Sequence, residues 1–135
     1  MVKNRTELRV RYAETDQMGY VYYGNYAAYY EVGRVELMRQ LGTSYRQIEE
    51  SGLMLPVRDF SVRYFKPALY DDLITVETRI EEMPTARIKF NYDIFNENAD
   101  LLTSAETTLV FVSKETNRPV PAPKSLLDAL NGFFE

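Results

Sequence analysis

The spacing of apolar residues in the first half of the chain predicts one strand followed by one long helix. Residues 6–13 alternate between apolar and charged side chains, with Tyr12 on the apolar side, which is typical of a half-buried strand. From Tyr26 to Leu41 the apolar residues recur every three or four positions, which is a helical period, and Gly42 is a suitable end for that helix. A short second helix is predicted from residue 43 or 44 to about residue 51.

The second half of the chain changes to a period of two from residue 55 onward. Apolar and polar side chains alternate through three segments, and a fourth is long and rich in Thr, Val and Phe. Short turn-like connections, "EEMPTA" and "NENAD", separate the last of these segments, as expected for antiparallel strands. The four predicted strands are 60–64, 74–80, 88–94 and 101–113, and a terminal helix is predicted at 125–133.

This order of elements indicates an α+β fold. A single helix that is apolar over much of its circumference requires burial on more than one side. One antiparallel sheet curled around the helix would satisfy both elements, and residues 1–135 are then a single domain.

Composition and charge exclude several classes of protein. The formal net charge of −4 argues against a nucleic-acid partner, because a phosphate backbone requires a net basic face. The first ten residues lack the apolar core of a signal peptide, and no segment approaches the length of a membrane span. We therefore expect a cytoplasmic protein with no membrane partner.

The absence of two residue types restricts the chemistry. The chain has no cysteine and no histidine, so it has neither a thiolate nor the commonest general base and metal ligand. No metal site is predicted. Catalysis at neutral pH would depend on carboxylates, backbone dipoles, hydroxyl groups, Lys or Arg.

The stretch "ETDQMGYVYYGNY", residues 14–26, places Asp16 about eight residues ahead of the predicted helix, which begins near Gly24 and Asn25, with Asn25 as a possible cap. The first amides of a helix have no partner within it, and the helix dipole adds about half a positive charge there. Such amides can hold the oxyanion of an acyl transfer while a carboxylate attacks the carbonyl or activates water. An Asp before a helix is more often a cap or turn residue, but Asp16 lies too far ahead to be the cap itself.

Residues 11–42, "RYAETDQMGYVYYGNYAAYYEVGRVELMRQLG", resemble the signature region of the 4-hydroxybenzoyl-CoA thioesterase branch of the hotdog superfamily. The later segment "VRYFKPALYDDLITVET", residues 62–78, resembles two strands of that family and the Pro-centred bend between them. The resemblance implies a hotdog fold, in which an antiparallel sheet of five to six strands wraps around one long central helix. It also implies hydrolysis of an acyl-CoA thioester to a free acid and coenzyme A, without a cofactor.

The resemblance also implies roles for individual residues. Asp16 becomes the catalytic carboxylate, and the backbone amide of Tyr23, next to Gly24, polarises the carbonyl. Many relatives carry His at the position of Tyr23, so the model for this chain is Asp with a backbone amide. Substrate-binding roles fall on the loop and helix start and on cations expected to meet the coenzyme A phosphates: Gly19, Tyr20, Asn25, Tyr26, Arg63, Lys66, Arg87 and Lys89.

Two pairs on the helix, Glu31 with Arg34 and Glu36 with Arg39, are spaced to form ion pairs. The unpaired edges of such a sheet predict at least a homodimer, or a homotetramer built as a dimer of dimers. Three alternatives remain open: a thioesterase acting on acyl carrier protein, a non-catalytic acyl-CoA-binding module, and a dehydratase, which the absence of histidine disfavours.

Overall fold

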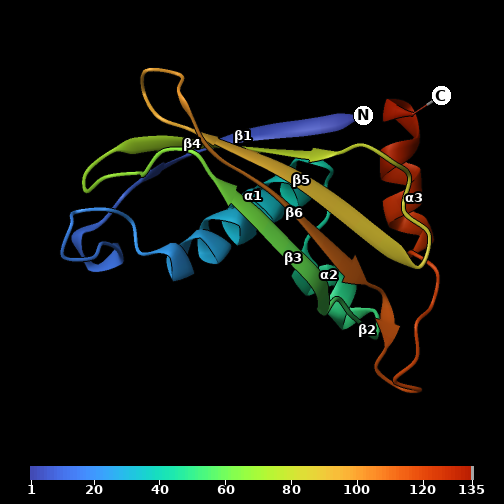
Figure 1. Ribbon diagram of the computed structural model, residues 1–135. Helices are drawn as coiled ribbons and strands as arrows, with labels where there is room; N and C mark the ends of the chain where they lie inside the picture. The colour runs from blue at the N-terminus through green and yellow to red at the C-terminus, as the bar shows by residue number, and fades with distance from the viewer. Residues whose placement is uncertain (135) are drawn as a thin grey trace.

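The computed structural model describes residues 1–134 and has the predicted α+β hotdog architecture. Its main sheet is antiparallel with the strand order β1-β4-β5-β6-β3, and the long helix α1, Tyr26–Gln40, lies against one face of it (Figure 1). The strands are β1 (Val2–Arg9), β3 (Val57–Tyr64), β4 (Leu73–Ile80), β5 (Arg87–Phe95) and β6 (Leu101–Val110).

Smaller elements complete the chain. The predicted strand 101–113 is divided, since β6 ends at Val110 and β7 (Val112–Ser113) pairs with β2 (Leu53–Met54) instead. The terminal helix begins and ends earlier than predicted, with a 3-10 turn taking its place at the end. The remaining helices are α2 (Tyr45–Glu50), α3 (Lys124–Leu130) and the 3-10 turns η1 (Tyr12–Glu14), η2 (Tyr23–Asn25) and η3 (Asn131–Phe133).

The first strand lies four residues earlier than the alternation predicts. Strand β1 pairs with β4 from Val2 opposite Ile80 to Arg9 opposite Leu73. Beyond Arg9 no partner strand remains, so the chain turns into η1, where Tyr12 is 78% exposed. The apolar alternation of residues 6–13 continues past the end of the partner strand, and pairing rather than pattern decides the boundary.

The helix α1 approaches the sheet closely at one glycine. A Cβ atom on Gly33 would lie 2.8 Å from Cγ1 of Val76 and still closer to the Thr78 hydroxyl, both on β4. Tyr30 and Leu37, one turn to either side, are fully buried. Gly33 therefore allows the helix backbone to lie directly on β4.

The prediction that the sheet covers α1 on more than one side is wrong for the single chain. Ala27, Ala28 and Val32 are exposed on the side of α1 that faces away from the sheet. The edge strand β3 is also open, with Phe60 43% and Tyr64 49% exposed although both point toward α1. A sheet that packs on one helix has one covered face and two free edges, and this leaves apolar surface beside β3 uncovered.

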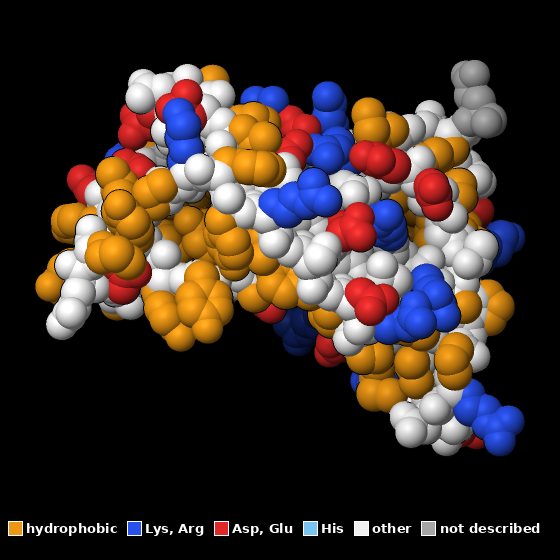
Figure 2. Space-filling view, viewed as in Figure 1, with side chains coloured by type: hydrophobic (Ala, Val, Ile, Leu, Met, Phe, Trp, Pro, Cys, Tyr) orange, Lys and Arg blue, Asp and Glu red, His pale blue; other side chains and the backbone are white. Residues whose placement is uncertain are grey.

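A second group of exposed apolar side chains surrounds the segment between β1 and α1. Figure 2 shows them gathered over the region where this segment and the β3–β4 connection lie in Figure 1. The large members are Tyr12, Met18, Tyr20, Tyr22, Tyr23, Phe65, Leu69 and Tyr70.

Candidate active site

Asp16 lies in a tight turn and uses one carboxylate oxygen to hold it. Its Oδ1 accepts hydrogen bonds from the backbone N–H groups of Met18, at 2.9 Å, and Tyr20, at 3.3 Å. Gly19 has φ +78, a left-handed conformation that glycine adopts without steric penalty. Asp16 therefore is a turn residue, but its Oδ2 accepts no hydrogen bond from the described residues and stays available for chemistry.

Backbone bonds attach the following segment to the β3–β4 connection and to the end of η1. The N–H of Val21 donates to the Ala68 carbonyl at 2.8 Å, and the N–H of Tyr22 donates to the Glu14 carbonyl at 2.9 Å. Asn25 occupies the N-cap position of α1, but its side chain does not cap the helix. Its Nδ2 instead donates to the Glu14 carbonyl at 2.8 Å, because Asn25 itself has helical torsion angles and continues η2 into α1.

The N–H groups of Tyr23 and Gly24 open η2, directly ahead of α1. Neither donates to an acceptor among the described residues. They lie at the positive end of a helix dipole, where a developing negative charge is stabilised.

A cavity of about 350 Å³ is lined by Asp16 and Tyr23. Of the predicted site residues it brings together Asp16, Tyr20, Tyr23, Tyr26 and Lys66. The prediction missed its far wall, made by the end of β3 and the bend after it; the aromatic pair followed by Lys-Pro in "RYFKP" was the available signal. The unpredicted lining residues are Met18, Val21, Tyr64, Phe65 and Pro67.

A second cavity, of about 380 Å³, follows next along α1. The first cavity lies between the segment ahead of α1 and the end of β3, and the second lies between α1 and β3. Each contains an aromatic contact between the two sides. The rings of Tyr26 and Tyr64 are 5.3 Å apart in the first, and those of Tyr30 and Phe60 are 6.0 Å apart in the second. The lining of the second cavity is Gly24, Ala27, Ala28, Tyr30, Glu31, Arg34, Val57, Phe60 and Thr107.

The predicted ion pair between Glu31 and Arg34 does not form. Arg34 turns into the core, where its Nε donates to the Tyr45 hydroxyl at 3.0 Å and its Nη1 to the Tyr92 hydroxyl at 3.1 Å. Helical spacing brought the two side chains within reach, but Tyr45 on α2 and Tyr92 on β5 offer Arg34 buried acceptors that the spacing could not reveal. The second predicted pair, Glu36 with Arg39, does form.

The predicted phosphate-binding cations are not gathered at one place. Lys66 lines the cavity beside Asp16 and lies 3.5 Å from the Asp100 carboxylate. Arg63, Arg87 and Lys89 lie on the sheet face opposite α1, where Lys89 pairs with Glu106 at 3.2 Å. The single chain therefore brings one of the four predicted cations to the cavity.

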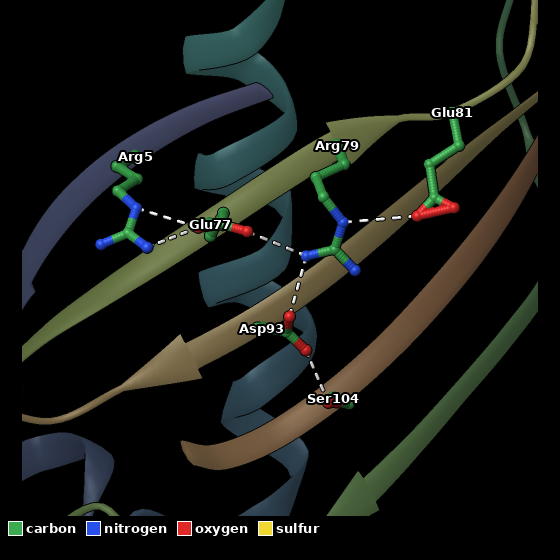
Figure 3. Close-up of polar contacts among 6 residues, drawn as sticks. All are labelled: Arg5, Glu77, Arg79, Glu81, Asp93 and Ser104. Carbon is green, nitrogen blue, oxygen red and sulfur yellow. Dashed lines mark hydrogen bonds and ion pairs between the residues drawn. The ribbon is translucent and has the colours of Figure 1, made fainter. Parts of the chain in front are cut away.

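The sheet face opposite α1 carries a charged network of its own (Figure 3). Glu77 accepts from Arg5 on β1, at 2.7 Å, and from Arg79, at 3.1 Å. Arg79 also reaches Asp93 on β5 at 2.8 Å, and Asp93 accepts from the Ser104 hydroxyl on β6 at 2.5 Å. This network joins four strands across the back of the sheet and lies apart from both cavities.

Among the described residues the site has the parts needed for acyl transfer: a carboxylate with a free oxygen, two unpaired amides and an apolar wall. Within residues 1–134 no group of three or more acidic side chains is placed to hold a metal ion. None of the helices in that range has the length and apolar character needed to cross a membrane.

Known proteins are similar to this chain over nearly its whole length. Residues 10–130 match the model of the thioesterase-like superfamily. A putative acyl-CoA thioesterase of Bacillus subtilis is 38% identical over 125 residues, covering 93% of this chain and 91% of the relative. The acyl-CoA thioester hydrolase YbgC of Escherichia coli is 33% identical over 123 residues, covering 91% and 92%.

Solved structures are also similar to this chain over nearly its whole length. A 1,4-dihydroxy-2-naphthoyl-CoA (DHNA-CoA) thioesterase from Staphylococcus aureus superimposes with a TM-score of 0.88 at 36% identity, covering 98% of this chain and 95% of that one. The chain therefore belongs to the thioesterase-like superfamily, as a thioester hydrolase with the hotdog fold.

Proposed function

We propose that the chain is an acyl-CoA thioesterase in which Asp16 supplies the reacting carboxylate and the amides of Tyr23 and Gly24 hold the oxyanion. One observation carries this assignment: Asp16 and Tyr23 line the same cavity, Asp16 Oδ2 is free, and the two amides have no partner among the described residues. A thioester carbonyl placed between them meets the carboxylate on one side and the donors on the other.

The reaction needs no histidine. Either Asp16 attacks the carbonyl carbon to give an anhydride that water then hydrolyses, or Asp16 takes a proton from the water that attacks. In both routes the carbonyl oxygen gains negative charge toward the two amides, the C–S bond breaks, and coenzyme A leaves as a thiolate. A thiol is far more acidic than an alcohol (the cysteine thiol has a pKa near 8.5), so the leaving group needs little protonation.

Coenzyme A as the donor is supported by the relatives, several of which are named for acyl-CoA or DHNA-CoA hydrolysis. Lys66 at the cavity is the cation best placed for a phosphate of coenzyme A. No cofactor is required in this scheme, and the cytoplasm, where coenzyme A is used, is the expected location.

We also propose that the active unit is at least a dimer joined along β3. The open edge of β3, its exposed Phe60 and Tyr64, and the bare side of α1 lie beside both cavities, so a second copy placed there would cover them. Light scattering should give a dimer or tetramer mass at micromolar concentration. A monomer that hydrolyses acyl-CoA at full rate would contradict the dimer.

The substitution Asp16→Asn tests the assignment of the carboxylate. Asn retains the Oδ1 acceptor that holds Met18 and Tyr20, so the turn is kept while the charge is lost. We expect the release of free thiol from acyl-CoA to fall by roughly 10²–10⁴-fold, with unchanged oligomer mass. Asp128→Asn, on the exposed side of α3, is the matched control.

Hydrolysis that persists in Asp16→Asn would refute the role of Asp16. If the wild-type protein releases no thiol from short, long, branched or aryl acyl-CoA but releases it from acyl-loaded acyl carrier protein, then acyl carrier protein is the donor. A protein inert on both would be a binding module.

A further inference from the structure

Within residues 1–134, Arg34 is a buried cation without an acidic partner. Its residue is 8% exposed, and its Nε and Nη1 donate to Tyr45 and Tyr92. No carboxylate lies within 4.0 Å of its guanidinium, and its Nη2 donates to no acceptor in the described part of the chain. Buried charges in proteins are normally paired, so this one leaves room for an anion from outside the chain.

The two tyrosines do not neutralise Arg34. Burial raises the pKa of Tyr45 to about 12 and also raises the pKa of Tyr92, whose hydroxyl contacts the Thr107 hydroxyl at 2.7 Å. Burial lowers the pKa of Arg34, but Tyr92 and Tyr45 outweigh this effect and the net pKa is raised. At neutral pH both hydroxyls are uncharged and the guanidinium keeps its full charge.

Arg34 also lines the second cavity, whose other walls are largely apolar. Val57, Phe60 and Tyr30 face it from β3 and α1. Glu31 is the one acidic residue of the lining; it is exposed, so solvent screens its charge more than that of Arg34.

The position of this cavity links Arg34 to the proposed reaction. Gly24, whose amide belongs to the proposed oxyanion site, lines the same cavity. From Gly24 to Arg34 the chain rises by about 15 Å along the helix axis, and the long Arg34 side chain leans back toward the N-terminus, which shortens the span to about 10 Å. An extended acyl group of about eight carbons covers this length.

We propose that the second cavity holds the acyl group and that Arg34 binds a carboxylate at its far end. The inference rests on the proposed function and narrows its substrate class to coenzyme A thioesters of dicarboxylic acids. A carboxylate can accept from Nη2 and from the second N–H of Nη1 together, and such two-point pairing is the geometry that Arg favours.

Two thioesters of equal length test the proposal: suberyl-CoA, an eight-carbon acyl group ending in a carboxylate, and octanoyl-CoA, ending in a methyl group. We expect the wild type to have at least about a tenfold higher kcat/KM for suberyl-CoA, since one charged pair of this kind discriminates by 1.4 kcal/mol or more. In Arg34→Gln the ratio of kcat/KM for suberyl-CoA to kcat/KM for octanoyl-CoA should fall to about one. Arg34→Lys should retain part of the preference.

Several results would overturn the proposal. A preference of the wild type for octanoyl-CoA would by itself overturn the proposal, even if Arg34→Gln fails to fold. A preference for suberyl-CoA that persists in Arg34→Gln, or an equal loss on both substrates, would give Arg34 a purely structural role.

Failure of the proposed function is recognised separately. If the wild type hydrolyses neither thioester, the non-hydrolysable thioether analogues of the two compounds are titrated by calorimetry. Tighter binding of the carboxylate-ended analogue to the wild type, but not to Arg34→Gln, would uphold the anion site. Equal binding of both analogues would reject it.

Discussion

The Asn25 side-chain amide donates to the backbone carbonyl of Glu14 at 2.8 Å, across eleven residues of sequence. The same carbonyl accepts from the Tyr22 N–H at 2.9 Å. Together the two bonds fasten η2 to η1. The Tyr23 and Gly24 amides, at the start of η2, thus have their direction set by a residue outside both cavity linings.

Substitution of Asn25 should therefore act on turnover more than on binding. In Asn25→Ala we expect kcat for acyl-CoA hydrolysis to fall by roughly 10–100-fold, with KM changed by less than about threefold, because misaligned amides stabilise the transition state less. Asn25→Asp, which cannot donate, should behave alike. Asn98→Ala, in an exposed turn, is the control, and a change confined to KM would count against a positioning role for Asn25.

Glu14 should make the stability of this segment depend on pH. Burial raises the pKa of its carboxyl, but hydrogen bonds from the Arg11 N–H and the Tyr29 hydroxyl, with the Arg11 guanidinium, outweigh it, and the pKa lies below the ordinary 4.5. A carboxyl whose pKa is lowered in the folded state stabilises the fold above its unfolded pKa. This stabilisation is lost as the pH falls through the lowered value.

The measurement is urea unfolding of Glu14→Gln at several pH values. At pH 7 we expect the variant to be less stable than the wild type by about 1–2 kcal/mol. The difference should shrink below pH 4.5 as the wild-type carboxyl becomes protonated. Glu49→Gln on the exposed side of α2 should show no such trend, and a difference that grows toward low pH would contradict the assignment.

Gly33 should not accept a side chain. The added methyl group of Gly33→Ala would press on Val76 and Thr78, so we expect a loss of about 1–3 kcal/mol in the free energy of unfolding. The loss should be smaller in a Thr78→Ala background, as a double-mutant cycle would reveal. Gly132→Ala, with no atom within 4 Å, is the control; equal effects at the two glycines would mean that the close approach is not limiting.

The network on the back of the sheet should support stability without affecting catalysis. Asp93→Asn removes the charge that faces Arg79 in a partly buried setting (Figure 3). We expect the free energy of unfolding to fall by about 1–3 kcal/mol. The kcat/KM for acyl-CoA should stay within about twofold. Glu106→Gln, in the exposed pair with Lys89, is the control and should lower the free energy of unfolding by less than about 1 kcal/mol. A large loss of turnover in Asp93→Asn would contradict the prediction that the network does not affect catalysis.

The sequence alone determined the order of elements, α1 with its end at Gly42, the inner faces of the strands, and the Asp16–Tyr23 segment as the candidate site. These features depend on local periodicity, on the backbone freedom of glycine and on a motif contained in one stretch of chain. Each can be read from neighbours in sequence.

Tertiary structure decided whatever depends on partners distant in the chain. The start of β1 follows from its pairing with β4, Asn25 bonds to Glu14 instead of capping α1, and Arg34 bonds to Tyr45 and Tyr92 instead of Glu31. Hydrogen-bond partners are chosen by burial and by which strands and helices meet, and periodicity carries no information about either. The cavity beside Asp16 has the same origin, since its far wall comes from the end of β3.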